Sequence, residues 1–155
     1  MSYRIRGLDP TPFAPLYGLP EAQLAELGIK RYLAKSNPGY PDRIELRDAD
    51  PGETVLLLNF VHQPASTPYR ASHAIYVIEG AVTPFDSVDR IPPVLGTRTL
   101  SVRGFDQNHM MIAGEITEGC ELGAMIEKMF ADPGVLYLQA HYAKRGCYAA
   151  RIDRA

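Results

Sequence analysis

The stretch LYLQAHYAKRGCYAARI, residues 136–152, decides the expected fold of this chain, because it reads as two strand-like runs around a short polar turn. Successive side chains of a strand point to opposite faces, so each run would bury one face and expose the other. A short polar segment between two such runs is typical of a hairpin. The chain is therefore expected to close with a β-hairpin.

A turn centred on Lys144 would set the register of this hairpin. One face would then carry three cross-strand pairs: His141–Cys147, Gln139–Ala149 and Tyr137–Arg151. Directly opposed residues have Cβ atoms about 4.5–5.5 Å apart, so the imidazole of His141 could reach the sulfur of Cys147. A slip of one residue would instead place the two side chains on opposite faces.

The rest of the chain indicates further strands and two helices. Expected strands cover residues 3–6, 29–34, 43–47, 54–61, 72–79, 98–105 and 110–116. A short helix is expected over 21–27, between Pro20 and Gly28. A long helix is expected over 118–131, with Thr117 as its N-cap and an apolar face formed by Leu122, Met125, Ile126, Met129 and Phe130.

Strands outnumber helices and mostly follow one another as hairpins. This order favours an α+β fold with a largely antiparallel sheet, one long helix in the C-terminal half, one short N-terminal helix and the closing hairpin. The length of 155 residues predicts a single globular domain over residues 1–155. The run TVLLLNFV, residues 54–61, is the most apolar and is expected to be a central strand.

Composition excludes several function classes. The net charge of −2 argues against a nucleic-acid-binding surface, which is normally strongly basic. No apolar run approaches the roughly 18 residues that cross a bilayer, and the N-terminus lacks a secretory signal. The two cysteines, Cys120 and Cys147, form no CxxC motif, so a reduced cytoplasmic protein is expected. Motifs of P-loop, Rossmann, α/β-hydrolase and zincin enzymes are absent.

The closing hairpin is the first candidate site. Cys147 would be a nucleophile and His141 its base, because a nearby imidazole or cation favours the reactive thiolate form of cysteine. Lys144, Arg145 and Arg151 lie close in sequence and could also line an anion site. The alternative is an exposed turn with solvated charges and an inert, half-buried thiol.

The segment from His62 to His73 is the second candidate site. It links two strands and carries His62, Tyr69, Arg70 and His73, which offer a base, donors and a guanidinium for a carboxylate or phosphate. The alternative is a surface loop whose Ser and Thr side chains satisfy their own backbone.

The leading hypothesis joins the two candidates into one pocket, between residues 62–73 and 141–147, for a small anionic ligand. Arg70, Lys144 and Arg151 would hold the anion, while His73 and His141 would orient it or transfer protons. A thiol enzyme using Cys147 and His141 is one alternative, and a non-catalytic protein-interaction module is another. Should the segments meet, His62, His73, His141 and Cys147 could bind a transition metal, although the spacing of His62 and His73 matches no metal motif. The sequence does not identify a cofactor.

Four stretches carry a family resemblance: YRIRGLDPTPFAPLY (3–17), PGYPDRIELRDADPGETVLLLNF (38–60), TPYRASHAIYV (67–77) and AHYAKRGCYAARIDR (140–154). In combination they resemble the uncharacterised bacterial family known as domain of unknown function 1203. The resemblance covers nearly the whole chain and implies a small stand-alone domain of bacterial type. It implies no activity, cofactor or catalytic residue.

Overall fold

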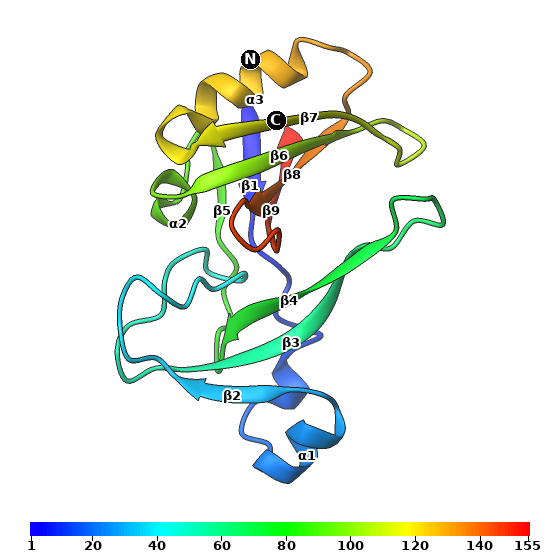
Figure 1. Ribbon diagram of the computed structural model, residues 1–155. Helices are drawn as coiled ribbons and strands as arrows, with labels where there is room; N and C mark the ends of the chain where they lie inside the picture. The colour runs from blue at the N-terminus through cyan, green and yellow to red at the C-terminus, as the bar shows by residue number, and fades with distance from the viewer.

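The computed structural model describes residues 1–155 as two antiparallel sheets with short helices against them (Figure 1). Helices make up 16% of the chain and strands 39%, which confirms the expected α+β class. The turn of the closing hairpin points from the larger sheet toward the smaller one (Figure 1). This arrangement brings the hairpin turn beside residues that are distant in sequence.

The larger sheet has six strands in the order β5-β1-β9-β8-β6-β7. Their bounds are β1 Tyr3–Arg6, β5 Asp86–Val88, β6 Thr99–Phe105, β7 Met111–Glu118, β8 Tyr137–Tyr142 and β9 Tyr148–Arg154. The expected closing hairpin is β8–β9, and it occupies the centre of the sheet. Every residue of β8 is buried, because neighbouring strands flank it and both of its faces are covered.

The smaller sheet has three strands in the order β2-β3-β4. They are β2 Lys30–Leu33, β3 Thr54–Gln63 and β4 Ala71–Ile78. The most apolar run, TVLLLNFV, forms β3, the middle strand, as its composition predicts. The sheet in which it is central is the smaller of the two. β3 also continues to Gln63, past a bulge after Val61, so His62 belongs to the strand and not to the loop.

The helices are short. They are α1 Glu21–Glu26, α2 Pro93–Gly96 and α3 Leu122–Phe130, with 3-10 turns η1 Ala14–Leu16 and η2 Gly119–Glu121. The expected helix over 118–131 therefore starts later, with Glu121 and not Thr117 as the α3 N-cap. Gly119 and Gly123 weaken helix formation in that first turn. No helix has both the length and the apolar character needed to cross a membrane.

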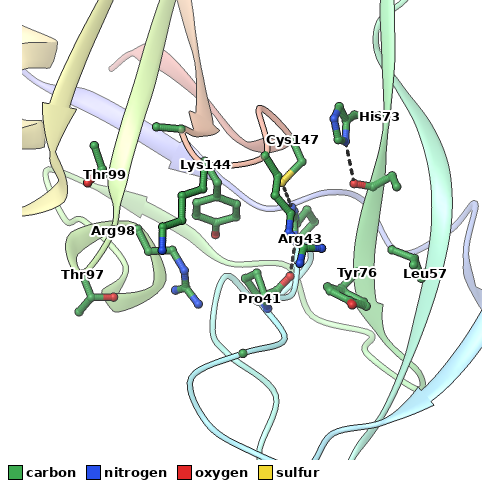
Figure 2. A pocket seen from close by; sticks show the side chains of 15 residues that line it. Pro41, Arg43, Leu57, His73, Tyr76, Thr97, Arg98, Thr99, Lys144 and Cys147 are labelled. Atoms are coloured by element: carbon green, nitrogen blue, oxygen red, sulfur yellow. Dashed lines mark hydrogen bonds between the residues drawn. The ribbon is translucent and has the colours of Figure 1, made fainter.

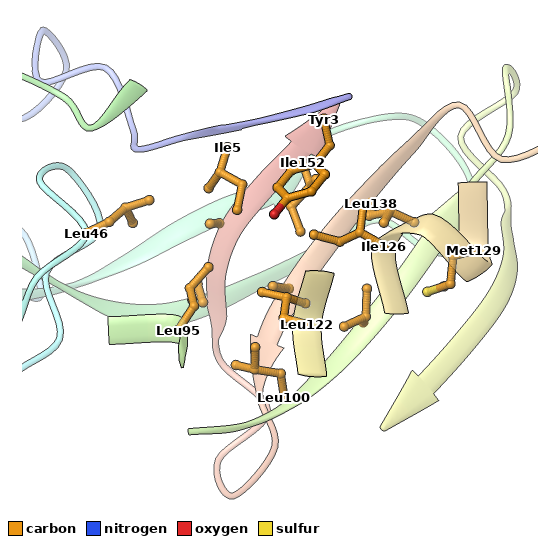
Figure 3. Close-up of a cluster of buried hydrophobic side chains, with 14 of the residues drawn as sticks. Tyr3, Ile5, Leu46, Leu95, Leu100, Leu122, Ile126, Met129, Leu138 and Ile152 are labelled. Atoms are coloured by element: carbon orange, nitrogen blue, oxygen red, sulfur yellow. The ribbon is translucent and has the colours of Figure 1, made fainter. Parts of the chain in front are cut away.

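Two apolar cores hold the molecule together. Figure 3 shows the larger one, in which the expected apolar face of α3, including Leu122 and Ile126, packs on the six-stranded sheet. Burying one such side chain stabilises the fold by about 1.5–3 kcal/mol. The smaller core packs α1 and its neighbours against the three-stranded sheet around Leu56 and Ile75.

The segment over residues 41–48 corrects a prediction, because residues 43–47 form no strand. The segment has only two isolated bridges, Pro41 to Asp48 and Asp42 to Tyr76, and Leu46 has a φ of +52°. The Asp42 carboxylate accepts hydrogen bonds from the backbone N–H groups of Ile44, Glu45 and Ile78, which replaces a strand ladder with a side-chain cap. The residue after it, Arg43, is thereby fixed between the two sheets.

Candidate functional site

A cavity of about 560 Å³ opens between the two sheets (Figure 2). Four separate parts of the chain form its walls: residues 39–43, the paired strands β3 and β4, residues 97–99 at the start of β6, and the β8–β9 turn at residues 142–147. Its volume lies in the range of pockets that hold small organic ligands. The cavity therefore depends on tertiary structure and on no single motif.

The hairpin that forms one wall has a different register from the predicted one. The cross-strand pairs are His141–Tyr148, Gln139–Arg151 and Tyr137–Asp153, with a bulge between Ala140 and His141. Gly146 has a φ of +75°, and its N–H donates to the Tyr142 carbonyl, which shifts the turn by one position. The expected pair of His141 and Cys147 is therefore wrong.

Cys147 lies at the floor of the cavity and contacts an arginine. Its Sγ accepts a hydrogen bond of 3.2 Å from Nη2 of Arg43, and the Cys147 residue is 8% exposed. The Arg43 guanidinium also donates to the carbonyl oxygens of Tyr148, at 2.8 Å, and Pro41. Arg43 is 2% exposed, so one buried cation ties the 41–48 segment to the hairpin.

Tyr142 lines the cavity beside Cys147 and has an unpaired hydroxyl. Its Oη is buried and has no hydrogen-bond partner. The guanidinium carbons of Arg43 and Arg98 lie 4.9 and 5.2 Å from the ring centroid. Burial raises the pKa of Tyr142 to about 12, so the phenol keeps its proton at pH 7 and its O–H can donate a hydrogen bond.

Three more basic side chains complete the cationic lining. Arg98 pairs with Asp48 at 2.6 Å, and Lys144 and Arg145 stand exposed at the rim. His73 reaches the cavity from β4. No Asp or Glu is among the lining residues, so the cavity presents positive charge to its contents.

His62 and His141 meet at a different place, between β3 and β8. Nδ1 of His62 lies 2.9 Å from Oε1 of Gln139, and Nε2 of His141 lies 3.2 Å from the same oxygen. The two imidazole rings are 4.8 Å apart, and Nδ1 of His141 lies 2.9 Å from the Gly146 carbonyl. The two predicted segments therefore meet twice: His62 and His141 meet through buried polar contacts, and His73 lies with the hairpin turn around the cavity.

Burial controls the charge of these two histidines. It lowers the pKa of His141 to about 3, and the residue is fully buried. It also lowers the pKa of His62, against the opposing effect of the Gln139 hydrogen bond. Both rings are accordingly neutral at pH 7, and neither lines the cavity.

The remaining predicted residues lie outside the cavity. Tyr69 and Arg70 are exposed on the β3–β4 loop, where Arg70 donates to the Pro64 carbonyl. Arg151 lies over the Tyr137 ring at 4.0 Å and pairs with Asp153. Of the predicted ligand-binding residues, only His73 and Lys144 line the cavity.

The proposed metal cluster is not formed. His62 and His141 lie together, whereas His73 and Cys147 line the cavity. No group of three or more His, Cys, Asp or Glu side chains is arranged to hold a metal ion.

Sequence reasoning missed Arg43, Arg98 and Tyr142. Arg43 lies in a segment whose alternating residues read as a strand, and the structure shows that side-chain caps override this pattern. The signal for Tyr142 was its position directly before the basic turn, where a tyrosine can face the same space as Lys144.

Comparison with known proteins places the chain in a family. A match to the family described as "Protein of unknown function (DUF1203)" covers residues 39–154, which include every residue that lines the cavity. No curated protein and no solved structure matches the chain. The match extends over well more than half of the sequence and takes in the last three resembling stretches, apart from Pro38, whereas the first stretch, residues 3–17, lies outside it. The chain therefore belongs to the DUF1203 family of proteins of unknown function.

Proposed function

We propose that the protein binds a small anionic molecule in the cavity between the two sheets. The observation that carries this proposal is that Arg43, Arg98, Lys144 and Arg145 line one cavity with no acidic residue among its walls. Guanidinium and ammonium groups are the side chains that bind carboxylates and phosphates. His73 and Lys144 keep the roles expected from the sequence, while Arg43 and Arg98 take the place of Arg70 and Arg151.

The balance of charge favours an anion. Four cationic side chains line the cavity, and one of them, Arg98, pairs with Asp48. Three positive charges therefore remain without a paired carboxylate around the cavity. Arg43 and Arg98 are largely buried, so water screens their field less than it screens the exposed rim. An anion entering between them would replace lost hydration with hydrogen bonds from the protein.

The cellular setting is proposed on separate grounds. Both cysteines are free thiols, as is usual for proteins of a reducing compartment, and this supports a cytoplasmic location. The family resemblance supports a bacterial source and a stand-alone domain.

Anion binding can be tested by thermal unfolding in inorganic phosphate and in sodium chloride at equal ionic strength. A ligand that binds the folded state alone raises Tm as its concentration passes Kd. We expect phosphate to raise Tm of the wild-type protein more than that of the Lys144→Gln/Arg145→Gln variant. Phosphate also stabilises proteins by exclusion from their surface, but that effect acts on both proteins alike.

A matched control removes two charges elsewhere. Lys30→Gln/Lys35→Gln changes net charge equally at exposed positions outside the cavity, and it should keep the full response to phosphate. Equal responses in both double variants would contradict the proposed site.

Thiol chemistry at Cys147 is a second candidate function. The contact between its Sγ and the Arg43 guanidinium, at the floor of the cavity, favours it. The proposed base, His141, does not share this contact, since its ring nitrogens lie against Gly146 and Gln139. Such a reaction would therefore rely on Arg43 and on the ligand.

A further inference from the structure

The cavity has two chemically different sides (Figure 2). The side formed by β6 and the hairpin turn carries Thr97, Arg98, Thr99 and Lys144. The opposite side, formed by β3 and β4, carries the apolar and aromatic side chains of Leu57, Ala74 and Tyr76, with His73 as its one basic residue. The first side offers hydroxyl, guanidinium and ammonium donors to an anion, whereas the second side is mostly apolar.

The Tyr142 hydroxyl is a hydrogen-bond donor that is available to the charged end of a ligand. Its hydroxyl is the one buried side-chain polar atom in the structure that has no hydrogen-bond partner. The residue is 7% exposed and lines the cavity, and the guanidinium groups of Arg43 and Arg98 both lie against its ring. A buried donor without a partner costs free energy, and the neighbouring guanidinium groups favour a negatively charged acceptor as that partner.

Tyr76 forms a fixed aromatic surface on the other side. Its ring centroid lies 5.5 Å from that of Tyr40 and 6.3 Å from that of Tyr32, and these contacts hold the ring in place. Leu57 pairs with Tyr76 across the β3–β4 ladder. A flat apolar group can pack against such a surface, because aromatic pairs gain energy beyond that of the area they bury.

We propose that the ligand is an organic oxyanion with a flat, apolar body, an inference that rests on the anion-binding function proposed above. Its carboxylate or phosphate end accepts a hydrogen bond from the Tyr142 hydroxyl and lies near Arg98 and Lys144. Its apolar body lies against Leu57, Ala74 and Tyr76. The volume of about 560 Å³ has room for such a molecule, since ligand pockets span about 300–1,000 Å³.

Four probes test this proposal by calorimetric titration at constant ionic strength: inorganic phosphate, phenyl phosphate, acetate and benzoate. Inorganic phosphate is compared with phenyl phosphate, and acetate with benzoate. The members of each pair share one kind of anionic group, and only the second member carries a phenyl ring. We expect the phenyl member of at least one pair to bind about tenfold more tightly than its partner, or better. Comparison of the two pairs distinguishes a phosphate from a carboxylate as the preferred end.

Two variants separate the ends of the ligand. Tyr142→Phe removes only the hydroxyl and should weaken the better phenyl probe by about tenfold or more, because it removes a hydrogen bond to a charged group. Tyr69→Phe makes the same change on an exposed loop outside the cavity and should change nothing. Tyr76→Ala should reduce the advantage of the phenyl probe while leaving the affinity for inorganic phosphate or acetate unchanged.

The outcomes distinguish the proposed amphipathic ligand from the simpler proposal that the cavity binds an anion. Binding of phosphate or acetate without a gain from the phenyl ring would overturn the amphipathic ligand and leave the anion site standing. Failure of all four probes to bind would overturn both. Circular dichroism shows whether each variant is folded, and the wild-type comparison decides the question even if Tyr142→Phe does not fold.

Discussion

Arg43 donates a hydrogen bond to Cys147 across 104 positions of sequence, with 3.2 Å between Nη2 and Sγ. This contact joins the irregular segment between the sheets to the turn of the central hairpin. The same guanidinium holds the Tyr148 and Pro41 carbonyl oxygens, so Arg43 both shapes the cavity and supplies part of its charge. Structure and proposed function therefore depend on one buried side chain.

Replacing Arg43 with Leu should lower the free energy of unfolding by about 2–5 kcal/mol. The change leaves the buried Tyr148 carbonyl and the partly buried Pro41 carbonyl without this donor, and a buried polar group without a partner costs about 1–3 kcal/mol. Urea denaturation measures the effect. Arg70→Leu, on an exposed loop, is the control and should stay within about 0.5 kcal/mol of wild type. Similar losses in the two variants would show that Arg43 does not hold the hairpin.

His141 should make stability depend on pH. Burial lowers its pKa from the ordinary value of 6.5 to about 3, so between these pH values the unfolded chain binds a proton that the folded chain does not. Its contribution is complete above pH 6.5 and declines as pH falls toward 3, by at most about 1.4 kcal/mol per pH unit. His62 acts in the same direction.

The variant His141→Gln isolates this contribution. Hydrogen bonds from Arg47 and Arg31 lower the pKa values of Glu53 and Glu79 to about 2. Protonation of these two carboxylates also destabilises the folded protein in acid, but only below about pH 4.5. Between pH 6.5 and 4.5 we therefore expect unfolding free energies measured in urea to fall more steeply for wild type than for His141→Gln. Parallel curves in that interval would contradict a neutral, buried His141.

The two cysteines should differ in their preference for charged reagents. Cys120 is exposed and should react first with neutral iodoacetamide, while Cys147 is buried at the cavity floor. Cations around Cys147 should attract the negatively charged iodoacetate. The rate of alkylation by iodoacetate, divided by the rate with iodoacetamide, should therefore be higher at Cys147 than at Cys120. Peptide mass spectrometry measures both ratios in one sample.

The rim residues supply the comparison for that experiment. Lys144→Gln/Arg145→Gln should lower the ratio at Cys147 and leave the ratio at Cys120 unchanged. Equal ratios at the two thiols of the wild-type protein would argue against a cationic cavity at Cys147, and with it against thiol chemistry on an anionic substrate.

Gly7 should be intolerant of a side chain. A Cβ at this position would lie 1.8 Å from the carbonyl oxygen of Ile44, which belongs to the segment that carries Arg43. Such overlap with backbone forces a shift that costs about 1–3 kcal/mol or more, measurable by urea denaturation of Gly7→Ala. Gly114→Ala meets nothing within 4 Å and should be neutral or slightly stabilising. Equal stability of the two variants would show that the close approach is not required.

The sequence predicts local elements better than their registers. Period-two alternation locates the β6–β7 and β8–β9 hairpins, and the 3–4 residue spacing of Leu122 and Ile126 identifies the buried face of α3. The β8–β9 register failed because a positive φ at Gly146 shifts the turn, and alternation carries no information about turn length. The observed register follows only when Gly146 is counted as part of the turn.

The site was harder to predict than the fold. Its walls come from four segments that only the packing of two sheets brings together. The sequence identified the basic hairpin turn and His73, but it could not show that Arg70 stays on an exposed loop or that His141 becomes fully buried. Arg43 was hidden because the Asp42 carboxylate replaces the expected strand, a tertiary effect that no local pattern contains.

The cavity between the two sheets is proposed to bind an anion, and this can be measured directly. The most direct measurement is a titration of the protein with inorganic phosphate, followed by two-dimensional NMR of assigned backbone amides, against a chloride titration at equal ionic strength. We expect saturable shifts concentrated at residues 39–43, 73–76, 97–99 and 142–147, which surround the cavity. Shifts confined to the exposed 64–70 loop, or no saturable shift beyond that of chloride, would contradict anion binding in the cavity.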